Sequence, residues 1–158
     1  MAVGFLGDLC ACPPFCWVGL CGEVLAHHTI KLRTSRRTEL KNVTSEVEKL
    51  VRESDCKSGV CHLYVPHTTA GVLINEGYDP DVARDMEGAF DRLVPDSPHF
   101  KHSEGNSDSH IKTALVGSSQ TTWIDNGHLA LGRWQQIFFA EFDGPRPREL
   151  YVKIVPDQ

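Results

Sequence analysis

The sequence predicts an α+β fold with about seven strands and three helices. Short apolar runs rich in β-branched and aromatic residues recur along the chain, and turn residues separate most of them. Helical spacing of apolar residues is found in only three segments. No Gly-rich phosphate loop joins a strand to a helix, which excludes a Rossmann or P-loop fold. The short connections between strands favour antiparallel neighbours.

The length and composition are those of one soluble globular domain. The chain has 158 residues, 41% of them hydrophobic and 23% charged, with a formal net charge of -5. Lys and Arg form no cluster, which argues against a nucleic-acid surface, and no apolar run approaches the roughly 20 residues of a membrane span. The N-terminus has no basic region before its apolar residues. We therefore expect no signal peptide, reduced thiols and a cytoplasmic location.

The chain divides into a Cys-rich extension, residues 1–24, and a domain, residues 25–158. Cys10, Cys12, Cys16 and Cys21 crowd the extension. Their spacing lacks the paired Cys-x2-Cys knuckles of common zinc modules, so a poorly ordered tail is the favoured interpretation. A soft-metal site and lipidation are the alternatives.

The domain is expected to open with two strands and a helix. Residues 27–32 and 39–43 form the strands. The helix runs to about residue 54, with Thr44 or Ser45 as its N-cap, because Ser45-x-x-Glu48 matches a capping box. A turn at residues 57–59 leads into a pair of buried strands, residues 60–65 and 72–74. Polar residues fill the connection between these strands and follow the second one: His67, Thr68, Thr69, Asn75 and Glu76.

A second helix begins at Asp79-Pro80, where Asp79 is a good N-cap and Pro80 fits the first helical position. Its apolar stripe consists of Val82, Met86, Phe90, Leu93 and Val94. A loop of residues 95–106 follows, and a loop of this length is more often functional than idle. Ser107 or Asp108 then caps a short helix that ends at Gly117.

The rest of the chain is β-structure. Residues 121–124 and 129–131 form a hairpin around Asn126-Gly127, a pair that suits a tight turn with positive φ. Residues 134–142 and 149–155 are two further strands, separated by a turn at residues 143–145.

The order and spacing of several motifs resemble the YjbQ-like family, whose members are often labelled secondary thiamine-phosphate synthases. The resemblance covers about residues 27–154, the whole domain. The motifs are His67-Thr68-Thr69-Ala70-Gly71, Asn75-Glu76, Asp79-Pro80, Asp85-Met86-Glu87, Ser109-His110-Ile111-Lys112, Leu115-x-Gly117, Gly132-x-Trp134-Gln135 and Glu141. The resemblance implies two antiparallel sheets in a sandwich, a homotrimer, a cleft that a neighbouring subunit completes, and thiamine-phosphate synthase-like activity. It gives no role for residues 1–24.

Three imidazoles are the candidate ligands of a divalent metal ion. His67, His102 and His110 would together form an open site that leaves positions for water or a substrate oxygen. Zn²⁺ suits an all-nitrogen set best. For His67 alone, a structural hydrogen bond to the backbone is the competing interpretation.

Glu76 and Glu141 are the candidate catalytic carboxylates. Glu76 ends an apolar strand, where it could act as a general base or orient a ligating His. Glu141 ends another strand, and an edge charge that discourages aggregation is an equally good interpretation.

Neutral donors and cations are the candidate substrate-binding groups, because they would hold the oxygens of a small phosphorylated ligand. For Lys112 the alternative is a solvated helix position. The candidates are Thr68, Thr69, Asn75, Lys112, Gln135 and Arg146.

Together these residues favour a metal-dependent enzyme that acts on a small phosphorylated metabolite. The resemblance implies a transferase of the thiamine-phosphate synthase kind. The alternatives are a metal-assisted phosphate-ester hydrolase and a non-catalytic homotrimeric module that binds a metal or a metabolite.

Overall fold

The computed structural model describes residues 27–158. It confirms an α+β fold with three helices and two antiparallel sheets, and it has eight strands where about seven were expected. Strand β6 (His128–Leu129) is the short second arm of the predicted hairpin. The Cys-rich extension predicted for residues 1–24 lies outside the described residues.

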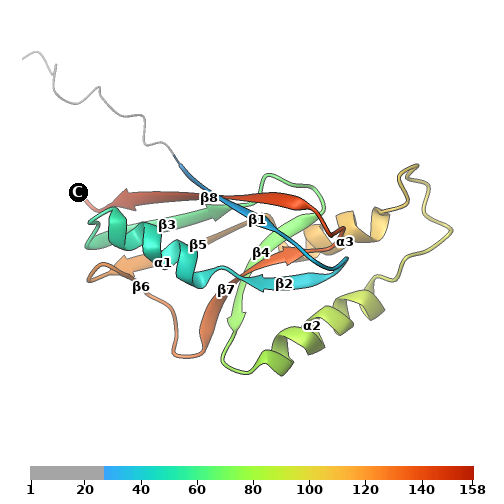
Figure 1. The fold of residues 1–158 in the computed structure, drawn as a ribbon, viewed down its shortest axis with the longest axis horizontal. Coiled ribbons are helices and arrows are strands. Elements are labelled where there is room, and N and C mark those ends of the chain that lie inside the picture. The colour runs from blue at the N-terminus through green and yellow to red at the C-terminus, as the bar shows by residue number, and fades with distance from the viewer. Residues whose placement is uncertain (1–26) are drawn as a thin grey trace, which may run out of the picture.

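One sheet has five strands in the order β1-β8-β3-β5-β6, and the other has three in the order β2-β7-β4. Every pairing is antiparallel (Figure 1). The remaining bounds are β1 (His28–Arg33), β2 (Glu39–Asn42), β3 (Ser58–Tyr64), β4 (Ala70–Glu76), β5 (Ser119–Asp125), β7 (Gln135–Glu141) and β8 (Pro147–Pro156).

The main core lies between the two sheets. Alternate residues of β3 and β8, such as Leu63 and Leu150, face alternate residues of the smaller sheet, such as Val72 and Phe139. All four are fully buried. This alternation fixes the strand register, because a slip of one residue would turn the apolar side chains toward solvent.

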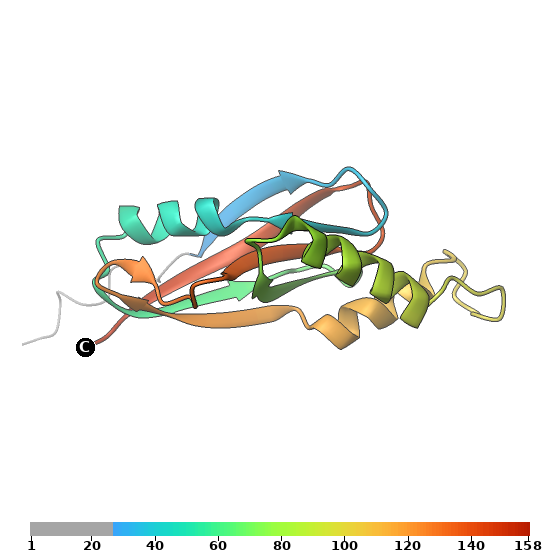
Figure 2. The same ribbon diagram turned by 90° about the horizontal axis from the view of Figure 1, so that it is seen from below.

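The three helices take different places around this core. Helix α1 (Thr44–Glu53) adds Val47 and Val51 to the main core. Helix α2 (Pro80–Leu93) lies along the outer face of the three-stranded sheet, and α3 (Ser107–Val116) runs beside the start of β4 (Figure 2). None of the helices within residues 27–158 is both long enough and apolar enough to pass through a bilayer.

The second helix behaves as its sequence predicts, except at its end. The Asp79 carboxylate accepts a hydrogen bond from the amide of Asp81 at 2.9 Å, which confirms the N-cap. Met86 and Phe90 pack against the smaller sheet, but Leu93 is 68% exposed. The last turn of α2 extends past the strands that its middle covers (Figure 1), which leaves Leu93 exposed, whereas Val94, directly after the helix, is buried.

The predicted caps of the other two helices are wrong. Helix α1 has Val43 as its N-cap, without a side-chain cap. The capping-box carboxylate, Glu48, instead accepts a hydrogen bond from the amide of Leu129 at 3.1 Å, a residue far away in the chain. Helix α3 is preceded by Asn106, also without a side-chain cap. The turn at Asn126-Gly127 is confirmed, with φ angles of 50° and 81°.

Candidate functional site

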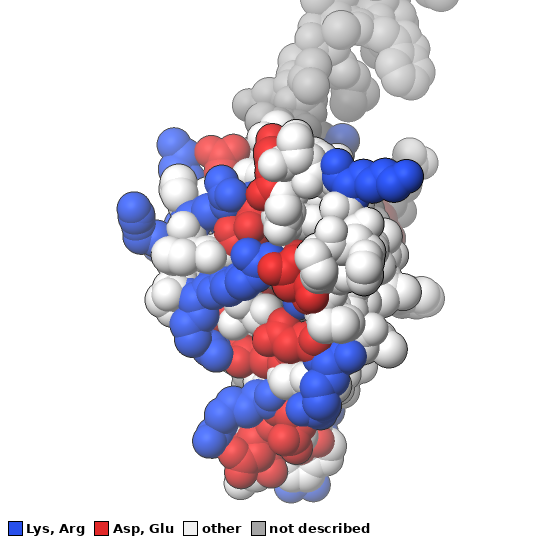
Figure 3. Space-filling model, turned by 90° about the vertical axis from the view of Figure 1, so that its right-hand side faces the viewer, with Lys and Arg blue, Asp and Glu red and all other residues white. Residues whose placement is uncertain are grey.

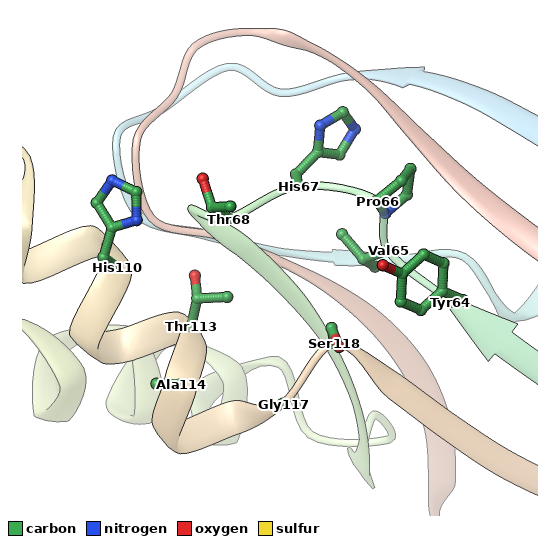
Figure 4. A pocket seen from close by; sticks show the side chains of 10 residues that line it. All are labelled: Tyr64, Val65, Pro66, His67, Thr68, His110, Thr113, Ala114, Gly117 and Ser118. Atoms are coloured by element: carbon green, nitrogen blue, oxygen red, sulfur yellow. The ribbon is translucent and has the colours of Figure 1, made fainter.

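A pocket opens where β3 ends and α3 passes the loop that leads into β4. Its volume is about 500 Å³. Its walls come from the end of β3, from the loop and from one side of α3 (Figure 4). The lining residues are Tyr64, Val65, Pro66, His67, Thr68, His110, Thr113, Ala114, Gly117 and Ser118.

Helix α3 presents one face to this pocket. His110, Thr113, Ala114 and Gly117 follow the spacing that places residues on the same side of a helix. The end of the helix lies against β4, where the amide of Val72 donates to the Gly117 carbonyl at 3.2 Å.

Gly71 permits this close approach of β4 and α3. A Cβ atom built on Gly71 would lie 2.5 Å from the Gly117 carbonyl oxygen, closer than real Cβ contacts. Gly117 itself has a φ of 93°, a conformation that glycine adopts without strain. The two glycines therefore set the position of α3, and with it the position of His110.

His67 is held in one orientation by the backbone. Its Nε2 accepts a hydrogen bond from the amide of Glu149 at 2.9 Å. Burial lowers the pKa of the His67 imidazole, and the nearby Arg148 guanidinium lowers it further. The ring is therefore neutral, and because Nε2 is the acceptor, its proton is on Nδ1. His67 and His110 stand on opposite walls of the pocket (Figure 4).

The Thr113 hydroxyl lies between these two imidazoles with no partner. Thr113 is only 7% exposed, and its Oγ1 has no hydrogen bond to any of residues 27–158. In Figure 4 the Thr113 hydroxyl points to the same side as that of Thr68. An unpaired buried hydroxyl costs about 1–3 kcal/mol, but this oxygen has almost no accessible surface, so a ligand in the pocket would reach it only after the Thr113 side chain rotates.

The third candidate imidazole, His102, lies outside the pocket and contacts the ring of His110. The ring centroids of His102 and His110 are 5.3 Å apart, with an edge-to-face angle of 82°. His102 belongs to the exposed loop between α2 and α3. His110 therefore has His67 across the pocket on one side and His102 in contact on the other.

These positions do not fit one three-imidazole zinc site. Within residues 27–158, no group of three His, Cys, Asp or Glu side chains is arranged to hold a metal ion. A ligating His usually donates a hydrogen bond through its other ring nitrogen. The Nε2 of His67 faces an N–H donor, so His67 in this orientation is not a metal ligand. His102 and His110 could supply two ligands.

The comparisons with known proteins identify the family. The family model described as "UPF0047 protein YjbQ-like" matches residues 28–157. The chain belongs to the YjbQ-like UPF0047 family. It is 51% identical to a UPF0047 protein of Methanocaldococcus jannaschii over 128 residues, which covers 81% of this chain and 93% of the relative. It is 45% identical to the UPF0047 protein YugU of Bacillus subtilis, covering 80% of this chain and 97% of that one.

Solved structures of UPF0047 proteins share this fold. A crystal structure of a YjbQ/UPF0047 protein from Clostridium acetobutylicum is 48% identical, with a TM-score of 0.79, and the match covers 81% of this chain and 99% of that chain. A YbjQ-like protein of unknown function from Sulfolobus solfataricus has the same TM-score at 30% identity, covering 83% and 96%. These matches confirm the predicted family and fold.

In this UPF0047 chain, the carboxylate of Glu141 is part of the core. It is 0% exposed and accepts hydrogen bonds from Nε and Nη2 of Arg148 at 2.7 and 2.6 Å. The Thr34 hydroxyl and the amides of Phe142 and Asp143 donate to it as well. Glu141 lies outside the pocket lining, and its contacts are those of a structural ion pair, unlike the catalytic role expected from the sequence.

Three other candidates lie at the far end of the smaller sheet. Strand β4 leads away from the His67 loop and ends at Glu76, about 20 Å from its start at 3.3 Å per residue. Glu76 pairs there with Gln135 of β7. The Asn75 side chain accepts from the amide of Glu76, and Gln135 accepts from the amide of Gly132. Within one chain, the structure does not bring these residues to the pocket.

The candidate cations are also engaged elsewhere. Lys112 is 2% exposed, and its Nζ bonds Asp91 at 2.7 Å and Asp108 at 3.2 Å. Arg146 pairs with Asp143 at 2.7 Å. Figure 3 shows basic and acidic side chains interspersed over this end of the molecule, so the face shows no separate basic patch.

Thr69 is buried as well, and its hydroxyl accepts from Arg148 at 2.8 Å. Of the predicted substrate-binding residues, only Thr68 lines the pocket. The sequence-based prediction missed Thr113 and Ser118. Thr113 could have been found, because it lies three positions after His110 on the same helical face.

The lowered pKa of His67 predicts a pH dependence of stability. Above about pH 6.5 the imidazole is neutral in both the folded and the unfolded chain. As the pH falls below that value, the unfolded chain takes up the proton first, so the free energy of unfolding decreases. Because the ring is partly solvated, we expect a loss of at most about 1 kcal/mol.

Urea unfolding at pH 7.5 and pH 5.5 measures this loss. His67→Gln keeps an acceptor for the Glu149 amide and should reduce the difference between the two pH values. His62→Gln, on the outer face of the larger sheet, is the control. An equal reduction in both variants would contradict the assignment to His67.

Proposed function

We propose that this UPF0047 chain is an enzyme that cleaves a small phosphorylated metabolite in the pocket between β3 and α3. The observation that carries the proposal is the pair of imidazoles on opposite walls, one of them locked in its tautomer by the Glu149 amide. The exposed Thr68 hydroxyl between them supports a ligand that offers hydrogen-bonding oxygens.

His67 acts as a fixed hydrogen-bond donor. Its Nδ1–H is directed at a phosphoryl oxygen, where negative charge increases in the transition state. The ring does not give up this proton, because Nε2 carries none and an imidazolate would result. A neutral imidazole with a lowered pKa is suited to this role of electrophile.

His110 is the group that exchanges a proton. It takes the proton of the attacking water and returns it to the leaving oxygen, acting first as general base and then as general acid. The hydroxyls of Thr68 and Ser118 hold the phosphoryl oxygens. The pocket lining includes no Lys or Arg, so neutral donors carry the recognition of the anion.

Loss of either imidazole is expected to reduce turnover. His110→Gln and His67→Gln should each lower kcat/KM by about 100-fold on a responsive phosphate ester. The assay panel contains phosphate monoesters together with the two phosphorylated precursors that thiamine-phosphate synthases join. His99→Gln, in the exposed loop before α3, is the control and should keep full activity.

The panel also distinguishes the alternatives. Product formation only from the precursor pair would favour the transferase that the resemblance implies. Binding of phosphate esters without turnover of any of them would overturn the proposal and favour a non-catalytic binding module. Full activity of His110→Gln, with an unchanged melting temperature, would also overturn it.

A divalent metal ion is the second candidate, and the contact between the His102 and His110 rings favours it. Zn²⁺ would be held by these two imidazoles and would supply Lewis acidity beside the pocket. Zinc titration by calorimetry tests this proposal, with His102→Ala expected to abolish binding and His99→Ala expected to keep it. Zinc binding that is insensitive to His102→Ala would contradict it.

A further inference from the structure

A second hollow lies on the other side of His110. Its volume is about 380 Å³, and it is lined by Phe100, His102, Ser107, His110 and Ile111. We refer to these five residues as the Phe100 groove. None of them except His110 belongs to the pocket described above. The Phe100 groove and the pocket therefore meet at a single imidazole.

Helix α3 explains this arrangement. Thr113 and Ala114 lie three and four positions after His110 and line the pocket. Ser107 lies three positions before His110 and Ile111 one position after it, and both line the groove. A ligand that extends along the helix past His110 would therefore occupy both hollows.

The two hollows differ in chemistry. The pocket lining carries four hydroxyl groups, those of Tyr64, Thr68, Thr113 and Ser118, and suits the oxygens of a phosphate. The Phe100 groove has the ring of Phe100, the half-exposed Ile111 side chain and the flat imidazole of His102, and no carboxylate, Lys or Arg lines it. Such a surface suits a flat apolar group.

We infer that the Phe100 groove is a subsite for an apolar, ring-sized group of the substrate. The phosphate occupies the pocket, and the bond that joins the two parts lies beside His110. The chemical class of substrate is then a phosphate ester with an apolar leaving group. This inference rests on the proposed function, because it assumes that a phosphorylated molecule occupies the pocket.

Two non-hydrolysable probes test the subsite without turnover. Phenylphosphonate and methylphosphonate carry the same charged group and differ in the apolar group. Calorimetry should show phenylphosphonate binding at least tenfold more tightly to the full-length protein. Ile111→Ser should reduce this preference to about twofold. Leu115→Ser changes an exposed apolar residue of the same helix outside both hollows and should leave the preference unchanged.

Equal affinity of the two probes for the unaltered protein would overturn the subsite, even if phosphate esters are turned over. A phenyl preference that survives Ile111→Ser would overturn it as well. If neither phosphonate binds, phenol is titrated alone. If phenol binds and Ile111→Ser abolishes this binding, the subsite in the Phe100 groove is supported, although the phosphate part of the proposed function fails. If phenol does not bind, the subsite is overturned.

Discussion

Replacing Glu141 by Gln is expected to lower the free energy of unfolding by about 3–5 kcal/mol. The carboxylate is completely buried and accepts five hydrogen bonds, two of them from Arg148. The Gln amide nitrogen would face donors, and the guanidinium of Arg148, itself 7% exposed, would lose its counter-charge. A buried charge without a partner is among the most destabilising changes that one substitution can make.

Urea unfolding at pH 7.5 measures this effect. Arg84→Ala is the matched control, because Arg84 forms an ion pair with Asp81 in which both side chains are about two-thirds exposed. An exposed pair is worth about 0–1 kcal/mol. The double variant Glu141→Gln/Arg148→Met should recover part of the loss, since it removes the unpaired cation. A loss from Glu141→Gln no larger than the control would show that the pair does not stabilise the fold.

Replacing Lys112 by Met is expected to cost about 3 kcal/mol. Lys112, the only Lys or Arg of α3, is 2% exposed and joins Asp108 of its own helix to Asp91 of α2. Met fills a similar volume but leaves the buried Asp108 carboxylate with Arg37 as its remaining cation. The effect is smaller than that at Glu141 because Asp91 is half exposed and can be hydrated.

The same substitution changes the acid sensitivity of the fold. Burial raises the pKa of Asp91, but hydrogen bonds from Lys112 and Thr38 more than offset it, so the pKa is lowered. This contribution to stability is present above about pH 4 and is lost as the pH falls through the folded pKa. Lys112→Met should therefore flatten the acid limb of the stability curve, whereas Lys49→Met, at an exposed position of α1, should not. An unchanged acid limb would contradict the assigned bond.

The sequence predicted the elements whose signals are local. Asp79-Pro80 marks the start of α2 because both the cap and the fixed φ act within a few residues. The Asn126-Gly127 pair specifies its turn in the same way. The capping box at Ser45 failed because Glu48 has a partner on β6, which no local pattern reveals.

The site residues also divide into those with a local signal in the sequence and those whose role depends on a partner far away in the chain. His67, Thr68 and His110 were found because imidazoles and hydroxyls at the ends of elements stand out in the sequence. Glu141 was assigned to chemistry because it follows an apolar run, and Lys112 because a cation can hold a phosphorylated ligand. Their partners, Arg148 and Asp91, become visible only in the folded chain.

Glu76 illustrates the effect of strand direction. It follows His67 closely in sequence, but the strand between them carries it to the other end of the sheet. Proximity along the chain is therefore a poor guide to proximity in space wherever an extended segment intervenes.

The missing side chain at Gly71 has a consequence for how this site can vary. Because Gly71 has no side chain, the backbone of β4 approaches the Gly117 carbonyl directly, and the Val116 side chain completes this contact. Residues such as Thr113 or Ser118 can then be exchanged to suit another ligand while the walls keep their separation. The separation of the pocket walls and the ligand selectivity of the pocket therefore depend on different residues. A redesign can change the selectivity and keep the separation of the walls.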